Sequence, residues 1–369
     1  MEDLLRKAIK RAKAEEMQKI GRKHSKDDEG IEKLLRASQA KIVVVGCGGA
    51  GCNTLQRMFE VGIVGGTTLA VNTDAQDLLK VSTDKKILIG KQLTRGLGAG
   101  SDPSVGEAAA KESLGELKDS LKGSDLIFIT CGMGGGTGTG SAPVVAEIAK
   151  EMKALTVGVV TLPFTVEGRK RGENAMLGIG NLRRSADTVI VIPNDKILEI
   201  APDLPVNAAF KVADEVLTNA VKGITEMVTK PGLINLDFAD LRTILSRGGA
   251  AMIGLGESKS SDASETRALE AVENALTSPL LDVDISDANR ALINVIGGSD
   301  MTLREAEMVV ETVSTRISPK AHIIWGAMVD DEIPKGKIQA MVVIAGGKFP
   351  YLDGGMSEKG ELDLGIEFT

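Results

Sequence analysis

The sequence predicts an α/β fold: a doubly wound, Rossmann-like parallel sheet, then one long central helix and a second, smaller α/β segment. Three observations predict it. Short apolar runs rich in β-branched residues alternate with helical patterns, as buried parallel strands and their crossover helices do. Several of these runs end in glycine-rich loops, and such loops at the carboxyl ends of parallel strands are where ligands bind. A continuous helical pattern then separates two such series of strands.

The first part begins with K-I-V-V-V-G at Lys41, a run typical of a strand buried on both faces. It leads into Gly46–Gly51, which matches G-x-G-x-x-G, with a helix expected from about Asn53. A further loop at 96–103 precedes a helix expected from about Val105. The remaining strands of this part are expected at 68–71, 86–90, 125–131, 155–162 and 188–194.

The richest loop is G-G-G-T-G-T-G, Gly134–Gly140, between the apolar run 125–131 and a helix expected over Ser141–Lys150 with Pro143 in its first turn. Glycines let the backbone approach an anion closely, and the helix N-terminus adds free N–H groups and a positive dipole end. Thr137, Thr139 and Ser141 can add hydroxyl donors. A flexible linker is the alternative, but linkers are not framed by a buried strand and a helix start. The pattern favours a phosphate site.

The long helix is expected over Val206–Thr229, where apolar residues cover so much of the circumference that the helix must be buried. Pro231-Gly232 ends it. The second part then has strands expected at 250–256, 291–298, 322–329 and 339–346, with helices near 263–277 and 302–316.

Composition excludes several classes of function. The net charge of −7 argues against a nucleic-acid partner, which would need a basic face. Three cysteines without a C-x-x-C pair fit a reducing cytoplasm, and two isolated histidines do not suggest a metal cluster. The chain has no apolar run of about 20 residues, so direct membrane insertion is not expected.

The glycine loops alone do not decide which nucleotide chemistry the chain performs. A dinucleotide oxidoreductase would use the loop at Gly46 and an acidic residue at the end of the second strand, where the chain has Asn72, with Asp74 two residues later. No G-x-x-x-x-G-K-[ST] occurs, so a Walker site is excluded. A monomeric Rossmann-type nucleotide-dependent enzyme therefore remains the alternative.

Several motifs in order resemble the tubulin/FtsZ superfamily: G-C-G-G-A-G-C-N (46–53), V-N-T-D-A-Q (71–76), G-L-G-A-G (96–100) and G-G-G-T-G-T-G (134–140). P-F-x-x-E-G-x-x-R (163–171) and N-L-D-F-A-D (235–240) resemble its FtsZ branch of cell-division GTPases. The resemblance covers about Lys41–Ile344, and A-F-K-V-A-D-E-V-L (209–217) is similar to archaeal members. It implies GTP hydrolysis, head-to-tail polymerisation with copies of itself, and a cytoplasmic place at the division site.

This resemblance also divides the chain. It implies a charged N-terminal extension (1–37), a GTP-binding domain (38–205), the central helix (206–232), a C-terminal α/β domain with a catalytic loop (233–345) and a flexible tail (346–369). The extension has eleven Lys/Arg against eight Asp/Glu, which favours a solvated helix over a membrane-surface or partner helix.

The residues themselves suggest how a guanine base could be recognised. Phe210 offers a flat face, and Asp214 at i+4 lies on the same side of the helix. A carboxylate there can accept from N1–H and the 2-amino group of guanine, a donor pair that adenine lacks. The alternative is that Phe210 is only core and Asp214 a solvated charge. The resemblance adds Asn53 and Asn194 as base contacts.

The other nucleotide contacts are implied by the resemblance. Glu167 and Arg171, which could equally be a surface ion pair at i and i+4, contact the ribose or the phosphate end. Mg²⁺ is held mainly through phosphates and water, without protein ligands. The loops implied to hold the nucleotide contribute Gly48, Gly49, Ala50, Asn72 and Asp74, then Gly98, Ala99 and Gly100 at the γ-phosphate, and Gly135, Gly136, Thr137, Gly138 and Thr139 at the α- and β-phosphates.

Catalysis presents a distance problem. Asp237 and Asp240 lie beyond the central helix, which spans about 36 Å, so they cannot reach a phosphate held at its other end. The resemblance implies that this loop inserts above the nucleotide of the next subunit, where both aspartates polarise water and Asn235 assists. The alternative is a plain helix N-cap with acidic residues in its first turn.

The last residues, Leu364 to Thr369, read L-G-I-E-F-T. We expect Leu364, Ile366 and Phe368 to anchor a membrane-tethering division adaptor.

Overall fold

The computed structural model describes residues 40–347, apart from 247, 260–264 and 282. The predicted N-terminal extension and the docking residues of the tail lie outside this part of the chain. None of the helices in the described part combines the length and apolar character that a membrane span requires.

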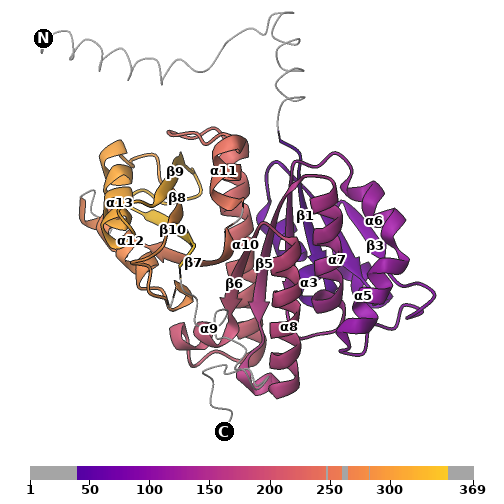
Figure 1. The fold of residues 1–369 in the computed structure, drawn as a ribbon. Coiled ribbons are helices and arrows are strands. Elements are labelled where there is room, and N and C mark those ends of the chain that lie inside the picture. Colours follow the sequence, from indigo (N-terminus) through magenta and orange to yellow (C-terminus); the bar gives the residue numbers. More distant parts are fainter. Residues whose placement is uncertain (1–39, 247, 260–264, 282, 348–369) are drawn as a thin grey trace, which may run out of the picture. The chain divides into compact units, whose positions relative to one another are not determined.

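One ten-stranded sheet organises the described residues, in the order β3-β2-β1-β4-β5-β6-β7-β10-β8-β9 (Figure 1). Its first six strands are parallel and have the strand order of doubly wound nucleotide-binding folds, as predicted. These strands are β1 (Ile42–Cys47), β2 (Gly66–Asn72), β3 (Lys85–Leu88), β4 (Leu126–Gly132), β5 (Leu155–Leu162) and β6 (Thr188–Pro193).

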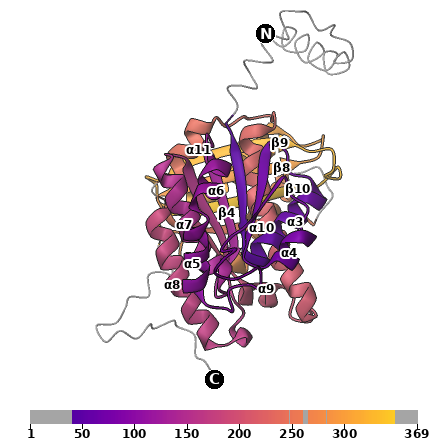
Figure 2. The ribbon, with the colours of Figure 1, turned by 90° about the vertical axis from the view of Figure 1, so that its right-hand side faces the viewer.

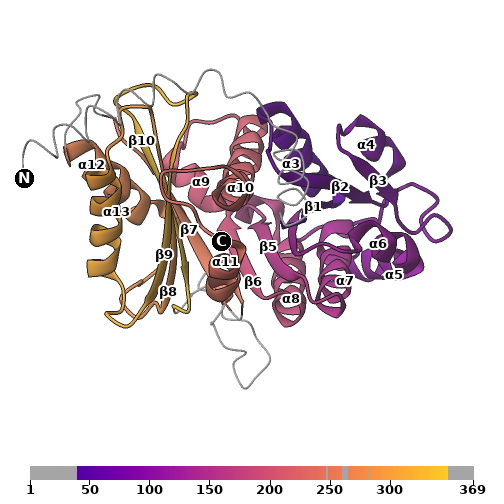
Figure 3. The same ribbon diagram turned by 90° about the horizontal axis from the view of Figure 1, so that it is seen from above.

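Helices cover both faces of this parallel part, which explains the continuous apolar runs. Val44 packs with α3, α4 and α10, while its neighbours Val43 and Val45 pack with the helices of the opposite face. Figures 2 and 3 show α5, α6, α7 and α8 together on that opposite face. The helices of this part are α3 (Gly48–Val61), α4 (Ala75–Lys80), α5 (Pro103–Glu112), α6 (Leu114–Leu121), α7 (Thr137–Glu151), α8 (Arg169–Ser185) and α9 (Asn194–Ile200), with a short 3₁₀ turn at Thr165–Glu167.

The long helix is α10 (Val206–Thr229), with the predicted bounds. Its buried side includes Ala213, Leu217, Ala220 and Ile224, which join the core of the parallel sheet to residues of the second part. The prediction that this helix is buried between two groups of strands is confirmed.

The second part continues the same sheet. β7 (Gly249–Glu257) pairs with β6 in parallel at only three positions and then pairs antiparallel with β10 (Ile338–Ala345) along its remaining length. β8 (Arg290–Gly297) lies between β10 and β9 (His322–Val329). The helices are α11 (Phe238–Leu245), α12 (Glu265–Leu276) and α13 (Leu303–Arg316), and α12 and α13 cover the face away from α10 (Figure 3). All four strands predicted here are present.

Three helices begin earlier than predicted, and each earlier start includes residues of a loop. α3 starts at Gly48 instead of Asn53, α7 at Thr137 instead of Ser141, and α5 at Pro103 instead of Val105. Pro143 therefore lies inside α7 and not in its first turn. Similarly, Asn194 begins α9 and does not end β6. Low helix propensity of glycine suggested later starts for α3 and α7, but their glycine segments themselves form the first helical turns. In α5 the added residues are Pro103 and Ser104, which follow the N-cap Asp102.

Candidate nucleotide site

A cavity of about 280 Å³ lies at the carboxyl ends of β1, β4 and β5, where the first turns of α3 and α7 meet α10. Predicted nucleotide-binding residues supply much of its wall. Those that line it are Gly48, Gly49, Ala50, Gly135, Gly136, Thr137, Gly138, Glu167, Arg171, Asn194, Phe210 and Asp214. Segments far apart in the sequence thus meet where the topology of a doubly wound sheet places a ligand.

Two helix N-termini converge at one end of this cavity. A Cβ on Gly48, which has a φ of +71°, would lie 2.7 Å from the backbone N of Gly138, so only glycine allows this approach. Neither α3 nor α7 has a side-chain cap or an acidic residue in its first turn. Their first N–H groups have no partner within the helix, and both dipoles point their positive ends here. This end of the cavity can bind an anion with several negative oxygens.

The glycine loops also leave room for a ligand. A Cβ added to Gly49 or Gly135 would meet no atom within 4 Å, and both residues border the cavity. Behind the loop the packing is close: a Cβ on Gly136 would lie 2.8 Å from the backbone N of Asp102. The loop before α5 therefore packs against the glycine loop 134–140 and supports it from one side.

Hydroxyl groups hold the loop 134–140 in shape. The Oγ1 atoms of Thr137 and Thr73 lie 2.6 Å apart, and Thr139 Oγ1 accepts a hydrogen bond from the N–H of Gly134 at 2.9 Å. Ser141 Oγ donates to the carbonyl of Thr137. These side chains are engaged within the protein, so the loop offers a ligand mainly its backbone N–H groups.

The opposite end of the cavity is built to accept hydrogen bonds. Asp214 Oδ1 lies 3.3 Å from Thr54 Oγ1, and burial raises the pKa of Asp214 to about 6 although that hydrogen bond acts to lower it. Asn194 is 4% exposed and its Oδ1 has no hydrogen-bond partner. Asn194 Oδ1 therefore lacks a donor, and Asp214 has only the hydrogen bond from Thr54. A buried acceptor without a donor is costly, so this arrangement suits a ligand that carries N–H groups.

An aromatic face lies beside these acceptors. Phe210 is 40% exposed, and its ring meets that of the buried Phe164 edge-on, with centroids 5.1 Å apart. Phe164 fixes the orientation of the ring, and the open face of Phe210 is available for stacking. The predicted pairing of Phe210 with Asp214 on one side of α10 is present in the cavity wall.

Glu167 and Arg171 form an ion pair that borders the cavity. Glu167 Oε1 also accepts a hydrogen bond from the N–H of Phe164 at 2.9 Å. Glu167 therefore stabilises the turn that carries Phe164. Arg171 is the more exposed member of the pair, and its ion pair with Glu167 holds its guanidinium group at the edge of the cavity.

Other predicted residues do not line the cavity. Asn53 is exposed on α3. Asn72 is buried, and its Oδ1 accepts from the N–H groups of Thr73 and Asp74, so it shapes the turn after β2. Asp74 caps α4. From the loop Gly98–Gly100 the cavity is reached by the next residue, Ser101.

Sequence reasoning did not select several residues that line the cavity: Cys47, Ser101, Gly132, Met133, Thr161, Pro163 and Ala213. Gly132, Thr161 and Pro163 lie at or just after the carboxyl ends of β4 and β5. The rule that ligands bind at strand carboxyl ends could have identified these three.

The predicted catalytic residues Asn235, Asp237 and Asp240 are exposed, and they lie just beyond the far end of α10 from Phe210 and Asp214. Asn235 Oδ1 accepts from the N–H of Gly232 at 2.6 Å. Asp237 is the N-cap of α11 and accepts from the N–H of Asp240 at 2.8 Å. The capping role considered in the sequence analysis is therefore real, and these side chains take no part in the cavity wall of their own subunit.

In the described residues, no group of three or more His, Cys, Asp or Glu side chains is arranged to hold a metal ion.

Comparison with known proteins gives consistent matches along the chain. The family model described as Tubulin/FtsZ family, GTPase domain, matches residues 41–202, and that described as FtsZ family, C-terminal domain, matches 249–348. The chain is 60% identical over 330 residues to Cell division protein FtsZ 1 of Thermococcus kodakarensis, covering 89% of this chain and 87% of that protein. It is 56% identical over 337 residues to the protein of that name from Methanocaldococcus jannaschii, covering 91% of each.

Solved structures agree. The FtsZ dimer of M. jannaschii has a TM-score of 0.82 at 57% identity, over 88% of this chain and 93% of that chain. CetZ2 from Haloferax volcanii, solved as a GTPγS-bound protofilament, has a TM-score of 0.73 at 23% identity, over 84% of this chain and 93% of that chain. The latter likeness concerns the fold alone.

Proposed function

The chain belongs to the tubulin/FtsZ family, and we propose that its cavity at the carboxyl ends of β1, β4 and β5 binds GTP and GDP. The protein is a polymerising, tubulin-like GTPase of the FtsZ type that acts in cell division. One observation carries the assignment of the site: the wall of a single cavity combines two uncapped helix N-termini with the unpaired Asn194 Oδ1 and the Asp214 carboxylate.

Guanine is the base that fits these two acceptors. Its N1–H and 2-amino groups can donate to Asp214, and a further donor can reach Asn194 Oδ1. Phe210 supplies a stacking surface. Adenine offers the Asp214 carboxylate no such pair of donors, so ATP should bind much more weakly.

The triphosphate then lies against the N-termini of α3 and α7, which supply backbone N–H groups in place of the lysine of a Walker site. Gly49 and Gly135 leave open space for the oxygens. Arg171 completes this end with a positive charge. The described residues of this site would leave a bound Mg²⁺ to be held through phosphate oxygens and water, and the ion would supply neutralisation of part of the phosphate charge.

Hydrolysis requires a second subunit. Asn235, Asp237 and Asp240 are exposed and lie beyond α10, a helix of 24 residues that spans about 36 Å. In a head-to-tail contact, the loop of one subunit reaches the nucleotide of the next, and the Asp237 and Asp240 carboxylates orient the attacking water. A heterologous contact of this kind repeats without closing, so it produces a filament.

Phosphate release from GTP, measured at several protein concentrations with filament pelleting in parallel, tests this proposal. We expect specific activity to vanish below a threshold concentration that coincides with the onset of pelleting. Asp240→Asn should keep GTP binding and assembly while turnover falls at least about a hundredfold. Constant specific activity without a pellet, or NAD binding in place of GTP, would show a self-contained site as in a monomeric Rossmann-type enzyme.

Recruitment to the division site is a separate proposal. The tail residues Leu364, Ile366 and Phe368 alternate with polar or small residues and can enter a groove of a membrane-tethering adaptor. Deletion of 364–369 should abolish adaptor capture and leave assembly and turnover intact. Unchanged capture by the truncated chain would place adaptor binding elsewhere.

A further inference from the structure

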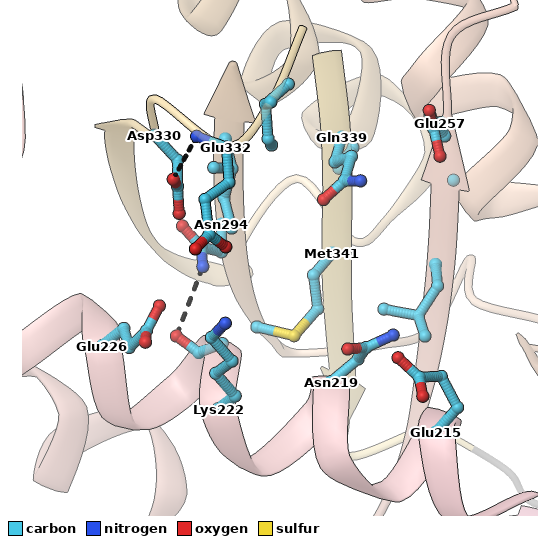
Figure 4. A pocket seen from close by; sticks show the side chains of 16 residues that line it. Glu215, Asn219, Lys222, Glu226, Glu257, Asn294, Asp330, Glu332, Gln339 and Met341 are labelled. Carbon is cyan, nitrogen blue, oxygen red and sulfur yellow. Dashed lines mark hydrogen bonds between the residues drawn. The ribbon is translucent and has the colours of Figure 1, made fainter. Parts of the chain in front are cut away.

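A second cavity, of about 480 Å³, lies between α10 and the strands β7, β10 and β8 (Figure 4). It is separate from the nucleotide site, since it has no lining residue in common with it. α10 reaches the sheet at Gly223, where a Cβ would lie 2.9 Å from Met341 Sδ. Around this contact the helix and the sheet enclose a space of the size that small organic ligands occupy.

The walls of this cavity are acidic. Five carboxylates line it against a single lysine, Lys222. Three carboxylates already have cationic partners: Glu215 pairs with Arg57 at 2.5 Å, and Lys230 lies 3.0 Å from Glu226 and 3.9 Å from Asp330. Glu257 and Glu332, on opposite sides of Gln339 in Figure 4, are exposed. The described residues provide neither of these two with an ion pair shorter than 4 Å.

A buried polar atom points to a ligand with hydrogen-bond donors. Asn294 is 0% exposed and lines the cavity. Its Nδ2 donates to the carbonyl of Gly223 at 3.3 Å, which fixes the amide orientation, and its Oδ1 has no hydrogen-bond partner. An unpaired buried acceptor costs about 1–3 kcal/mol, which an N–H donor from a ligand can recover.

The remaining lining is aliphatic. Leu255, Ile296, Ile333 and Met341 lie between the polar groups. Among the described residues, no group of three acidic, histidine or cysteine side chains is arranged to hold one metal ion. Glu257 and Glu332 lie on opposite sides of Gln339 in Figure 4, and aliphatic side chains line the cavity with them, so the cavity suits separate positive charges joined by apolar links.

We propose that this cavity binds a linear aliphatic polyamine. Ammonium groups of the ligand pair with Glu257 and Glu332, an N–H donates to Asn294 Oδ1, and the methylene segments lie on Met341 and its aliphatic neighbours. The two exposed carboxylates gain cationic partners, and Asn294 Oδ1 gains a donor.

Titration calorimetry with spermidine tests the proposal, on the full chain carrying GDP, with free nucleotide removed, at about 150 mM salt. We expect saturable binding of one spermidine per chain. Glu257→Gln combined with Glu332→Gln should weaken it at least about tenfold, since two charge-assisted contacts are lost. Glu307→Gln with Glu311→Gln, which removes two charges from exposed positions on α13 on the other face of the sheet, should leave it unchanged.

A second variant distinguishes binding inside the cavity from association with surface charge. Gln339 is an exposed lining residue on β10, and Gln339→Trp fills the space while every carboxylate remains. We expect this variant to lose spermidine binding and to keep the unfolding midpoint of the wild type within about 2 °C. Undiminished binding by Gln339→Trp, equal weakening in the α13 control, or a non-saturating isotherm would each overturn the proposal, because the polyamine would then associate with the surface only.

Discussion

The hydroxyl of Thr54 lies between two acceptors: Oγ1 is 3.0 Å from the carbonyl oxygen of Ala50 and 3.3 Å from Asp214 Oδ1. A hydroxyl has one proton, so it can fully satisfy only one of them. Asp214 therefore receives at best a shared hydrogen bond, and burial holds its pKa at about 6. The Asp214 carboxylate, which we assign to guanine recognition, can therefore accept further hydrogen bonds from the base.

GTP affinity should accordingly depend on pH. Only the ionised carboxylate accepts from both N1–H and the 2-amino group, so binding favours that form and lowers the pKa of Asp214 in the complex. Above about pH 7, one unit above this pKa, the affinity should be constant. At pH 5 about nine tenths of the free protein carries a protonated Asp214, and affinity should be about tenfold lower than at pH 7.5. Fluorescent GTP titrations below the assembly concentration measure this.

Asp214→Asn is the matched control, since it keeps the shape and removes the titration. Its GTP affinity should be low and independent of pH between 5 and 7.5. A wild-type affinity that stays flat over this range, or a pH dependence that persists in Asp214→Asn, would contradict the assignment of Asp214.

Gly135→Ala should affect ligand binding and not folding. The added Cβ meets no protein atom within 4 Å and projects into space that we assign to phosphate. The backbone of Gly135 has no positive φ, so alanine causes no strain there. We expect unchanged stability within about 0.5 kcal/mol and at least about tenfold weaker GTP binding, measured by urea unfolding and nucleotide titration.

Gly180→Ala in α8 provides the comparison, because its Cβ also meets no atom and the residue is exposed and remote from the cavity. Alanine should stabilise this helix by about 0.5–1 kcal/mol without changing GTP affinity. Equal GTP affinity in both variants would mean that phosphates do not lie over Gly135.

The strands were predictable because burial on both faces leaves a continuous apolar signal, as in K-I-V-V-V-G before Gly46. The helix starts were not, because residues 48–52 and 137–140 are helical despite their glycine content. α8 was also missed: its polar residues conceal the buried positions Ala175, Ile179 and Leu182. Contacts with the rest of the fold, absent from any local pattern, decide these elements.

The residues of the site were likewise only partly predictable from the sequence. Phe210 and Asp214 could be paired from the helical period alone, since they are one turn apart. The hydrogen-bond partner of Asp214 could not be predicted, because Thr54 is 160 residues away in the sequence. The sequence also could not show that Asn72 shapes a turn, since its acceptor role depends on the local path of the backbone after β2.

Asp237 has a structural role that must be separated from its proposed chemical one. Its side chain caps α11, so Asp237→Ala should cost about 1 kcal/mol of stability. Asp237→Asn keeps a capping acceptor and should fold like the wild type. If the carboxylate orients water, both variants lose GTP turnover while filaments still form, as phosphate release and pelleting would show. Normal turnover in Asp237→Asn would leave Asp237 only its capping role.

A buried ion-pair network joins α12 to α13. Arg267 is 1% exposed; its Nε lies 2.5 Å from Glu305 Oε1 and its Nη1 2.7 Å from Asp300 Oδ2. Burial opposes the charged form of Glu305, but the hydrogen bonds from Arg267 and Thr302 together outweigh it and lower the pKa of that carboxyl. Arg267→Met leaves this carboxylate buried without its partner and should destabilise the protein by about 3–5 kcal/mol in urea unfolding at pH 7.

Two measurements identify the unpaired charge as the cause. Adding Glu305→Gln to Arg267→Met removes the charge and keeps an acceptor for the N–H of Thr302 at the start of α13, so it should restore most of the loss. In Arg267→Met the pKa of Glu305 should rise, because the hydrogen bond from Arg267 no longer opposes burial. The variant should then regain stability relative to the wild type as pH falls through that raised pKa. A deficit that is the same at pH 5 and pH 8, and that Glu305→Gln does not repair, would indicate lost packing by the arginine side chain instead.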